Sequence, residues 1–425
     1  MQHSVSKVVL HNGAEGLLID VPSANVTTID IIFRAGDYLS PPGKTDTAHI
    51  MEHLVLGANK KYPSAKEFSK EFTKYGAYNN AYTGDYHMGY EAECEAGETV
   101  RILDLLCDAI EAPLFTESDF TAEVGNVREE LKMRRNNDDV ELSLLLENAM
   151  GFVPKSYRLR ATELSAITLK DVANHYKRTH TTSNMRFVLA GPIKKYQSDI
   201  RKRLDAIGLP RGDGYTPLPD EVPVALQKPI VVTNNNLDNI CYRWEVVLPS
   251  FTDYVERDSL NALQEVLFSG FHSRVFGELR EKGLVYGIFG NYYETKNNVV
   301  HVINGQVQSK NIQKVFTILR KELDDVAKNG IDDTELAELK KRAFGEVQRY
   351  NQTPGQLSGW YRQAFIQRNE IMQFDTIGAR LDAINNNSII VAAQRLLKSN
   401  IYGIGFMHHD TDTIDANLLQ DSLRQ

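Results

Sequence analysis

The pentapeptide His-Ile-Met-Glu-His at 49–53 constrains this chain more than any other feature. Residues 45–47 are typical helix N-caps, and a helix that starts there places His49 and His53 one turn apart on the same face. Two such imidazoles can bind one metal ion, and histidine nitrogens are good ligands for zinc. The carboxylate of Glu52 lies close enough to take a proton from a metal-bound water. Alone, the pattern also fits a chance cluster on a solvated helix face.

A candidate third ligand, Glu130, follows His53 after 76 intervening residues. The apolar residues around it recur at helical spacing, at Phe120, Val124, Val127 and Leu131. Glu130 can complete a His₂Glu set that leaves the fourth zinc position open to water, as catalytic sites do. Glu123 lies two turns earlier on the same helix face and could hydrogen-bond a ligating histidine. The alternative is that both are ordinary charges on a Glu-rich exposed helix.

The order H-x-x-E-H, followed at this distance by Glu130, resembles the M16 metallopeptidases, the family of pitrilysin, insulin-degrading enzyme and the mitochondrial processing peptidase. The flanking segments 34–36, 41–45 and 60–64 resemble the family too, and the resemblance spans essentially the whole chain. It is closest to the short bacterial-type members. It implies one zinc ion per chain held by His49, His53 and Glu130, with Glu52 as general base. Glu123 matches the family's second glutamate.

The resemblance also assigns a role to Asn80, Ala81, Tyr82 and Thr83. It implies that they form an edge strand, which holds an extended peptide through its backbone N–H and C=O groups. The alternative is a buried strand followed by a turn at Gly84-Asp85. The family often has two glycines before this strand, whereas residues 75–79 here read Tyr-Gly-Ala-Tyr-Asn. The entrance of the strand is therefore expected to differ.

Composition bounds the remaining possibilities. A chain of 425 residues predicts at least two domains, and 42% hydrophobic with 24% charged residues is typical of a soluble globular protein. The net charge of −8 argues against nucleic-acid and anionic-membrane partners. Three scattered cysteines indicate reduced, buried thiols. No secretory signal and no run of 18 apolar residues is present, so we expect a cytoplasmic protein.

The order of predicted elements indicates an α+β fold, and the resemblance implies two related domains. Each is expected to have a mainly antiparallel sheet with helices packed on one face, as in the half-clamshell of the M16 family. We predict a zinc-binding domain at 1–212, a Pro- and Gly-rich linker at 213–228, and a related domain at 229–425. The second half repeats a strand at 240–248 and a helix at 254–268. Aligning Gly57 with Gly270 places Ala262, Glu265 and Val266 opposite His49, Glu52 and His53, so no second metal set is predicted.

The segment 273–286 resembles the part of the family's second domain whose arginine and tyrosine approach the zinc site. Arg280 and Tyr286 fill those positions, although six residues separate them where seven are usual. Such groups would stabilise a developing oxyanion. The alternative is a surface arginine and a strand tyrosine. In family members of this length the arginine and tyrosine face the zinc of another chain, so the resemblance implies a homodimer, with a heterodimer as the competing arrangement.

Two further histidine groups have weaker patterns. His408-His409-Asp410 could suggest a metal patch, but its polar surroundings predict an exposed segment. His87 follows the predicted edge strand and could contact a substrate. We assign neither group a role.

The resemblance implies a zinc-dependent endopeptidase that hydrolyses oligopeptides or unfolded segments inside a closed dimeric chamber. One alternative is a non-catalytic or partner-dependent subunit, which would typically have lost a motif residue. Another is a zinc amidohydrolase of small molecules, which would need a narrow pocket in place of a strand-addition edge.

Overall fold

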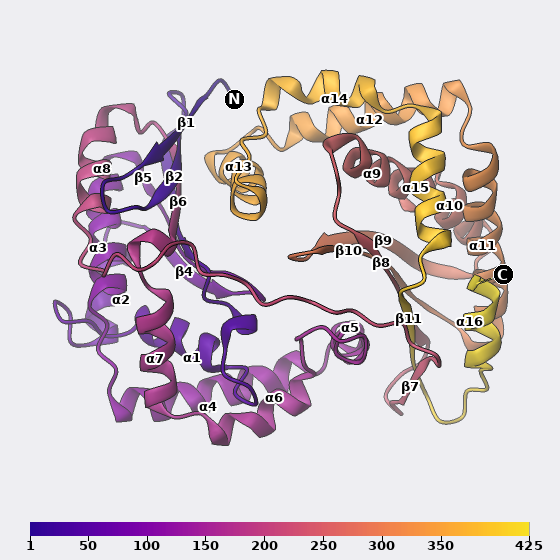
Figure 1. Cartoon of the computed structure of the whole chain (residues 1–425), viewed down its shortest axis with the longest axis horizontal. Coiled ribbons are helices and arrows are strands. Elements are labelled where there is room, and N and C mark those ends of the chain that lie inside the picture. Colours follow the sequence, from indigo (N-terminus) through magenta and orange to yellow (C-terminus); the bar gives the residue numbers. More distant parts are fainter. Residues whose placement is uncertain (425) are drawn as a thin grey trace. The chain divides into compact units, whose positions relative to one another are not determined.

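The computed structural model describes residues 1–424, which form two compact units, each built on one sheet (Figure 1). The first unit contains residues 1–133, 158–219 and 347–373. The second contains residues 134–157, 220–346 and the remainder from residue 374. The α+β fold with two mainly antiparallel sheets is therefore confirmed.

The sheet of the first unit has six strands in the order β1-β2-β6-β3-β5-β4. All neighbours run antiparallel except β2 and β6, which are parallel. β4 therefore lies at the edge and pairs with β5. The strands are β1 (Ser4–Val9), β2 (Glu15–Asp20), β3 (Val26–Phe33), β4 (Tyr78–Thr83), β5 (Met88–Glu95) and β6 (Met185–Gly191).

Helices cover both faces of this first sheet. One face buries Phe33 of β3 against His180 and carries most of the helices. On the other face, α13 packs its Leu357, Tyr361 and Phe365 against apolar side chains of β2, β3 and β6. The helices are α1 (Thr47–Val55), α2 (Ala65–Thr73), α3 (Thr99–Glu111), α4 (Glu117–Arg134), α6 (Tyr157–Glu163), α7 (Leu169–Thr179), α8 (Gln197–Asp205) and α13 (Pro354–Arg368).

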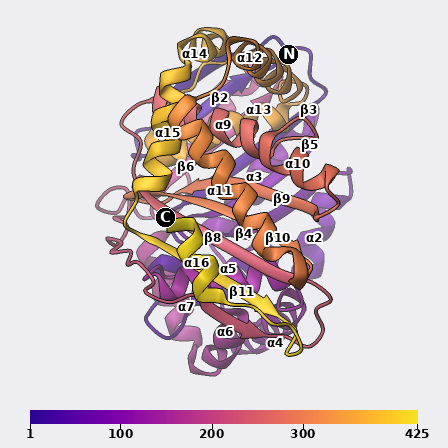
Figure 2. The ribbon, with the colours of Figure 1, turned by 90° about the vertical axis from the view of Figure 1, so that its right-hand side faces the viewer.

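The sheet of the second unit has five strands in the order β7-β11-β8-β10-β9, with β7 and β11 parallel. Helices α11, α15 and α16 lie in front of these strands in Figure 2, and α5 packs on the opposite face. The strands are β7 (Ile230–Thr233), β8 (Ile240–Pro249), β9 (Val285–Glu294), β10 (Asn298–Val307) and β11 (Tyr402–His408). The helices are α5 (Asp138–Ala149), α9 (Tyr254–Phe268), α10 (Arg274–Glu281), α11 (Ile312–Asn329), α12 (Asp333–Arg349), α14 (Ile377–Ala383), α15 (Asn386–Lys398) and α16 (Ala416–Arg424).

The units differ from the predicted division into continuous halves. The chain passes from the first unit to the second after Pro219, inside the Pro- and Gly-rich segment, which contains neither helix nor strand. The chain also crosses between the units near residues 134, 157, 346 and 373. These crossings arise because each half of the chain contributes one helix to the sheet that is built mainly from the other half. Each sheet thus carries a helix on the face that the prediction left uncovered.

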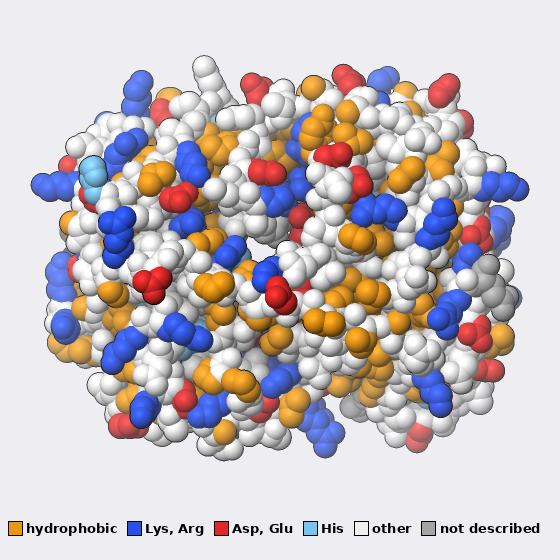
Figure 3. All heavy atoms as spheres, in the orientation of Figure 1, with side chains coloured by type: hydrophobic (Ala, Val, Ile, Leu, Met, Phe, Trp, Pro, Cys, Tyr) orange, Lys and Arg blue, Asp and Glu red, His pale blue; other side chains and the backbone are white. Residues whose placement is uncertain are grey.

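The surface of each unit carries mixed charges. On the face drawn in Figure 3, Lys and Arg side chains alternate with Asp and Glu side chains over both units. All three cysteines are free and buried, as predicted. Within the described chain, no helix is both long enough and apolar enough to cross a membrane.

Candidate metal centre

Helix α1 presents the H-x-x-E-H motif from a buried position beneath the edge of the first sheet. Asp46 occupies its N-cap position, and the backbone N–H of Ala48 is capped by Ser40 Oγ at 3.3 Å. His49 and Glu52 are buried, at 5% and 8% exposure. The apolar residues that anchor the helix in the core are Ile50, Met51, Leu54 and Val55.

The structure brings His49, His53 and Glu130 together. Glu130 Oε2 lies 3.3 Å from His49 Nε2 and 3.9 Å from His53 Nε2, and the two imidazole rings are perpendicular, 4.8 Å between centroids. One ligand atom from each residue lies within 4.8 Å of the others. It is the one cluster of His, Cys, Asp and Glu side chains with this geometry in the part of the chain that the structure describes.

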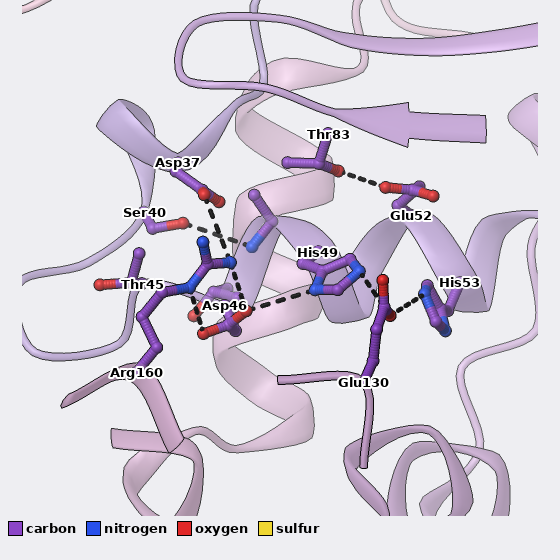
Figure 4. A network of polar contacts seen from close by, with 12 residues as sticks. Asp37, Ser40, Thr45, Asp46, His49, Glu52, His53, Thr83, Glu130 and Arg160 are labelled. Carbon is purple, nitrogen blue, oxygen red and sulfur yellow. Dashed lines mark hydrogen bonds and ion pairs between the residues drawn. The ribbon is translucent and has the colours of Figure 1, made fainter. Parts of the chain in front are cut away.

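Each histidine also contacts a carboxylate on its far side, and Figure 4 shows this contact for His49 and Asp46. His53 Nδ1 lies 2.8 Å from Glu123 Oε2, and His49 Nδ1 lies 3.3 Å from Asp46 Oδ1. An ionised carboxylate only accepts hydrogen bonds, so both Nδ1 atoms carry a proton. Both Nε2 atoms are turned toward Glu130, where a bound metal would take the place of a second proton. This arrangement of histidines between a metal and a carboxylate is the usual one in metal sites.

The donor set fits zinc. Tetrahedral ligands about 2.1 Å from zinc lie about 3.4 Å from one another, which is close to the two separations between Glu130 and the histidines. Two neutral imidazoles and one carboxylate leave a fourth position for water. The hydrogen bond with His53 lowers the pKa of Glu123, so this carboxylate stays ionised as an acceptor.

The carboxylate behind His49 belongs to a second cluster of charged residues, formed by Asp46, Arg160 and Asp37. Arg160 of α6 donates to both oxygens of Asp46, from Nη2 at 2.6 Å and from Nε at 3.1 Å, and its Nη2 lies 3.5 Å from Asp37. Burial tends to raise the pKa of Asp46, but the hydrogen bonds from His49 and Arg160 outweigh it and lower that pKa to about 2. Burial raises the pKa of Asp37 to about 7 in spite of Arg160.

Glu52 lies beside the cluster and outside it. Its Oε2 accepts a hydrogen bond from Thr83 Oγ1 at 2.5 Å, which joins the carboxylate to the last residue of β4. The predicted substrate-binding residues Asn80, Ala81, Tyr82 and Thr83 all lie in β4, which is an edge strand rather than a buried one. That a peptide adds to this edge stays a prediction.

Two matches to models of peptidase domains cover most of the chain. Residues 17–163 match the model described as insulinase, peptidase family M16, and residues 166–343 match the model described as the M16 inactive domain. The chain belongs to the M16 peptidase family. The first match contains all three residues of the cluster, His49, His53 and Glu130. The second match covers most of the second unit, for which no metal ligands were predicted.

Several proteins of known sequence or structure resemble the chain, some over nearly its full length and one over about a third of it. An uncharacterized zinc protease of Streptomyces coelicolor is 23% identical over 93% of this chain and 87% of its own. Protease 3 of Escherichia coli is 30% identical, but over only 32% of this chain and 14% of its own. A Helicobacter pylori protease structure covers 96% of this chain and 100% of its own with a TM-score of 0.84 at 18% identity. The M16 inactive domain from Pseudomonas fluorescens covers 97% and 99%, with a TM-score of 0.85 at 15% identity.

Arg280 and Tyr286, which were predicted to approach a zinc site, contact each other in the second unit. The guanidinium carbon of Arg280, in α10, lies 4.9 Å from the ring centroid of Tyr286, in β9, and Arg280 Nη1 donates to the carbonyl of Val285 at 3.3 Å. Tyr286 is 86% exposed. A role for this pair at a zinc site remains a prediction.

His87 and His408, to which the sequence assigned no role, both contact neighbouring protein groups. His87 is half-buried against Tyr215, with 3.1 Å between its Nε2 and the tyrosine hydroxyl, and desolvation lowers the pKa of His87 to about 3. His408 was predicted to be exposed, and that prediction is wrong. It closes β11 with 9% exposure and its Nδ1 lies 2.7 Å from the carbonyl of His409, because the strand continues one residue further than its apolar pattern.

Sequence reasoning missed the partners of His49 and Glu52. Asp46 was interpreted as a helix cap, although its position three residues before His49 places both side chains on one face. Thr83 was assigned to the strand without a link to Glu52. Arg160 lies in a separate helix, and no spacing in the sequence connects it to the motif.

Proposed function

We propose that this protein is a zinc-dependent endopeptidase. The observation that carries the proposal is the convergence of His49 Nε2, His53 Nε2 and Glu130 Oε2, with a carboxylate behind each imidazole. Membership of the M16 family and relatives named zinc proteases support it. Bound at these three residues, zinc would acidify a water molecule and polarise a peptide carbonyl.

The residues around the metal set would divide the remaining work. Glu52 accepts the proton of the attacking water and returns it to the leaving amine, as general base and then acid. Thr83 donates to Glu52 Oε2 and so restricts where the carboxylate can point. Glu123 accepts from His53 Nδ1 and holds that ring in its ligating tautomer.

An extended segment of peptide is the substrate that suits this site. A peptide paired with the free edge of β4 would run past Thr83, whose hydroxyl contacts the proposed base. Oligopeptides and unfolded segments can adopt that conformation, whereas a folded protein must first open.

We further propose a cytoplasmic homodimer, in which each zinc faces Arg280 and Tyr286 of the other chain. The exposure of Tyr286 leaves its hydroxyl available to another molecule. A heterodimer with a related subunit is the alternative. Gel filtration with multi-angle light scattering separates the two, because a monomer that becomes active only with a second protein would exclude the homodimer.

Digestion of a mixed peptide pool, followed by mass spectrometry, tests the activity. Zinc-loaded protein should generate internal cleavages, and a chelator should abolish them. Glu52→Gln protein purified in the same way is the control for contaminating proteases. Zinc-loaded wild-type protein that yields no products, or the same products as the control, would exclude the endopeptidase.

A further inference from the structure

The side chain of Asp46 does not cap helix α1, although Asp46 occupies the N-cap position. Asp46 occupies the N-cap of α1, and aspartate at this position usually accepts a hydrogen bond from a backbone N–H of the first turn. No such bond forms here, and Ser40 Oγ receives the N–H of Ala48 in its place. The carboxylate is therefore free to bond other groups.

Those groups are a proposed metal ligand and a guanidinium. Asp46 Oδ1 lies 3.3 Å from His49 Nδ1 and 2.6 Å from Arg160 Nη2, and Oδ2 lies 3.1 Å from Arg160 Nε (Figure 4). The side chain of Asp46 is fully buried and that of Arg160 is 11% exposed. Burying a carboxylate without a counter-charge is energetically costly, and Arg160 supplies that charge. The bidentate contact with Arg160 also fixes the orientation of the Asp46 carboxylate.

We infer that Asp46 and Arg160 are positioning residues for the metal centre, with Arg160 orienting Asp46 and Asp46 orienting His49. This inference rests on the proposed zinc site. The hydrogen bond keeps the proton on Nδ1 and aims the Nε2 lone pair at the point shared with His53 and Glu130. Asp46 thus does for His49 what Glu123 does for His53.

A purely structural explanation makes a different prediction. Helix α6 is joined to the start of α1 by a second contact, in which Glu163 Oε2 accepts from the Thr45 N–H at 3.2 Å and from its hydroxyl at 2.8 Å. If Asp46 and Arg160 only hold the two helices together, loss of the negative charge of Glu163 in the neighbouring contact should disturb the metal centre equally. If they orient His49, loss of the Asp46 charge should have a separate effect.

Zinc affinity of the full-length protein, measured by competition with a chromophoric chelator, distinguishes these cases. The test variant is Asp46→Asn, because asparagine has nearly the same shape as aspartate but lacks its negative charge. The matched control is Glu163→Gln. The absorption spectrum of cobalt-loaded protein serves as a second readout of the ligand geometry.

We expect Asp46→Asn to weaken zinc binding by about 10- to 100-fold and to alter the cobalt spectrum. Glu163→Gln should retain wild-type affinity and the wild-type spectrum. Wild-type affinity in folded Asp46→Asn, or an equal loss in both variants, would overturn the inference. Wild-type protein that binds no zinc would overturn the proposed function itself, which is a different result from zinc binding that is indifferent to Asp46.

Thermal unfolding of the metal-free proteins establishes that the variants are folded. If Asp46→Asn does not fold, Arg160→Gln takes its place, because it leaves the aspartate and its contact with His49 and removes the guanidinium. It should also weaken zinc binding. Wild-type affinity in Arg160→Gln would refute the role of Arg160 as well as the chain of contacts through Asp46.

Discussion

Replacement of Glu52 by Gln tests the proposed base most directly. Gln has nearly the same shape and can still accept the hydrogen bond from Thr83 Oγ1, but it cannot take a proton from water. General-base catalysis typically contributes 10²- to 10⁴-fold, or about 3–5 kcal/mol of transition-state stabilisation. The other three carboxylates that surround the site, Asp46, Glu123 and Glu130, already contact histidines, so no substitute base is in place.

The assay measures kcat/KM on a fluorogenic peptide chosen from the digest, together with zinc content by elemental analysis. Glu52→Gln should keep one zinc per chain and lose activity by about 10²- to 10⁴-fold. Because the zinc content is measured on the same sample, loss of metal cannot be mistaken for loss of the base. Folded, zinc-loaded Glu52→Gln with more than about a tenth of wild-type activity would refute the assigned role.

Further substitutions test other contacts of the metal centre and one buried histidine of the second unit. Thr83→Val removes the hydroxyl that donates to Glu52 and should lower kcat by about 10- to 100-fold, since a hydrogen bond to a charged group contributes about 1.5–3 kcal/mol, whereas Thr83→Ser should retain activity. Glu130→Gln should abolish stoichiometric zinc binding, while Glu123→Gln should only weaken it by about 10- to 100-fold, both measured by chelator competition. Burial lowers the pKa of His301 to about 3, and its Nε2 has no hydrogen-bond partner among the described residues, so His301→Leu should raise the free energy of unfolding by about 1–3 kcal/mol at pH 7. That gain should grow by about 1.4 kcal/mol per pH unit below pH 6.5, because only the unfolded wild-type chain takes up the proton, and chemical denaturation at pH 7, 6 and 5 would show no such trend if His301 were charged when folded.

The sequence predicts the local part of the metal centre well. A motif within one helix fixes the relative positions of His49, Glu52 and His53, and two turns of a second helix fix Glu123 and Glu130. The pairing of these two helices in space came from the family resemblance, since no periodicity encodes it. The contacts of Asp46 with Arg160 and of Glu52 with Thr83 lay beyond prediction, because each joins elements that only the folded chain brings together.

The domain boundaries show a second limit of local patterns. Strand β3 is buried on both faces, whereas the predicted sheet has helices on one face only. Nothing in the local pattern of the sequence identifies a second covering helix. In the structure α13, more than 300 residues later in the chain, buries Leu17, Ile19 and Ile32 on the second face. Exposing three such side chains costs roughly 5–9 kcal/mol, which is comparable to the whole stability of a typical domain. A fragment of residues 1–212, the predicted domain, should therefore expose this face, bind a hydrophobic dye and unfold without a cooperative transition. Adding residues 347–373 through a flexible linker should restore the transition, and a fragment 1–212 that melts cooperatively by itself would show that the second face of the sheet does not need α13.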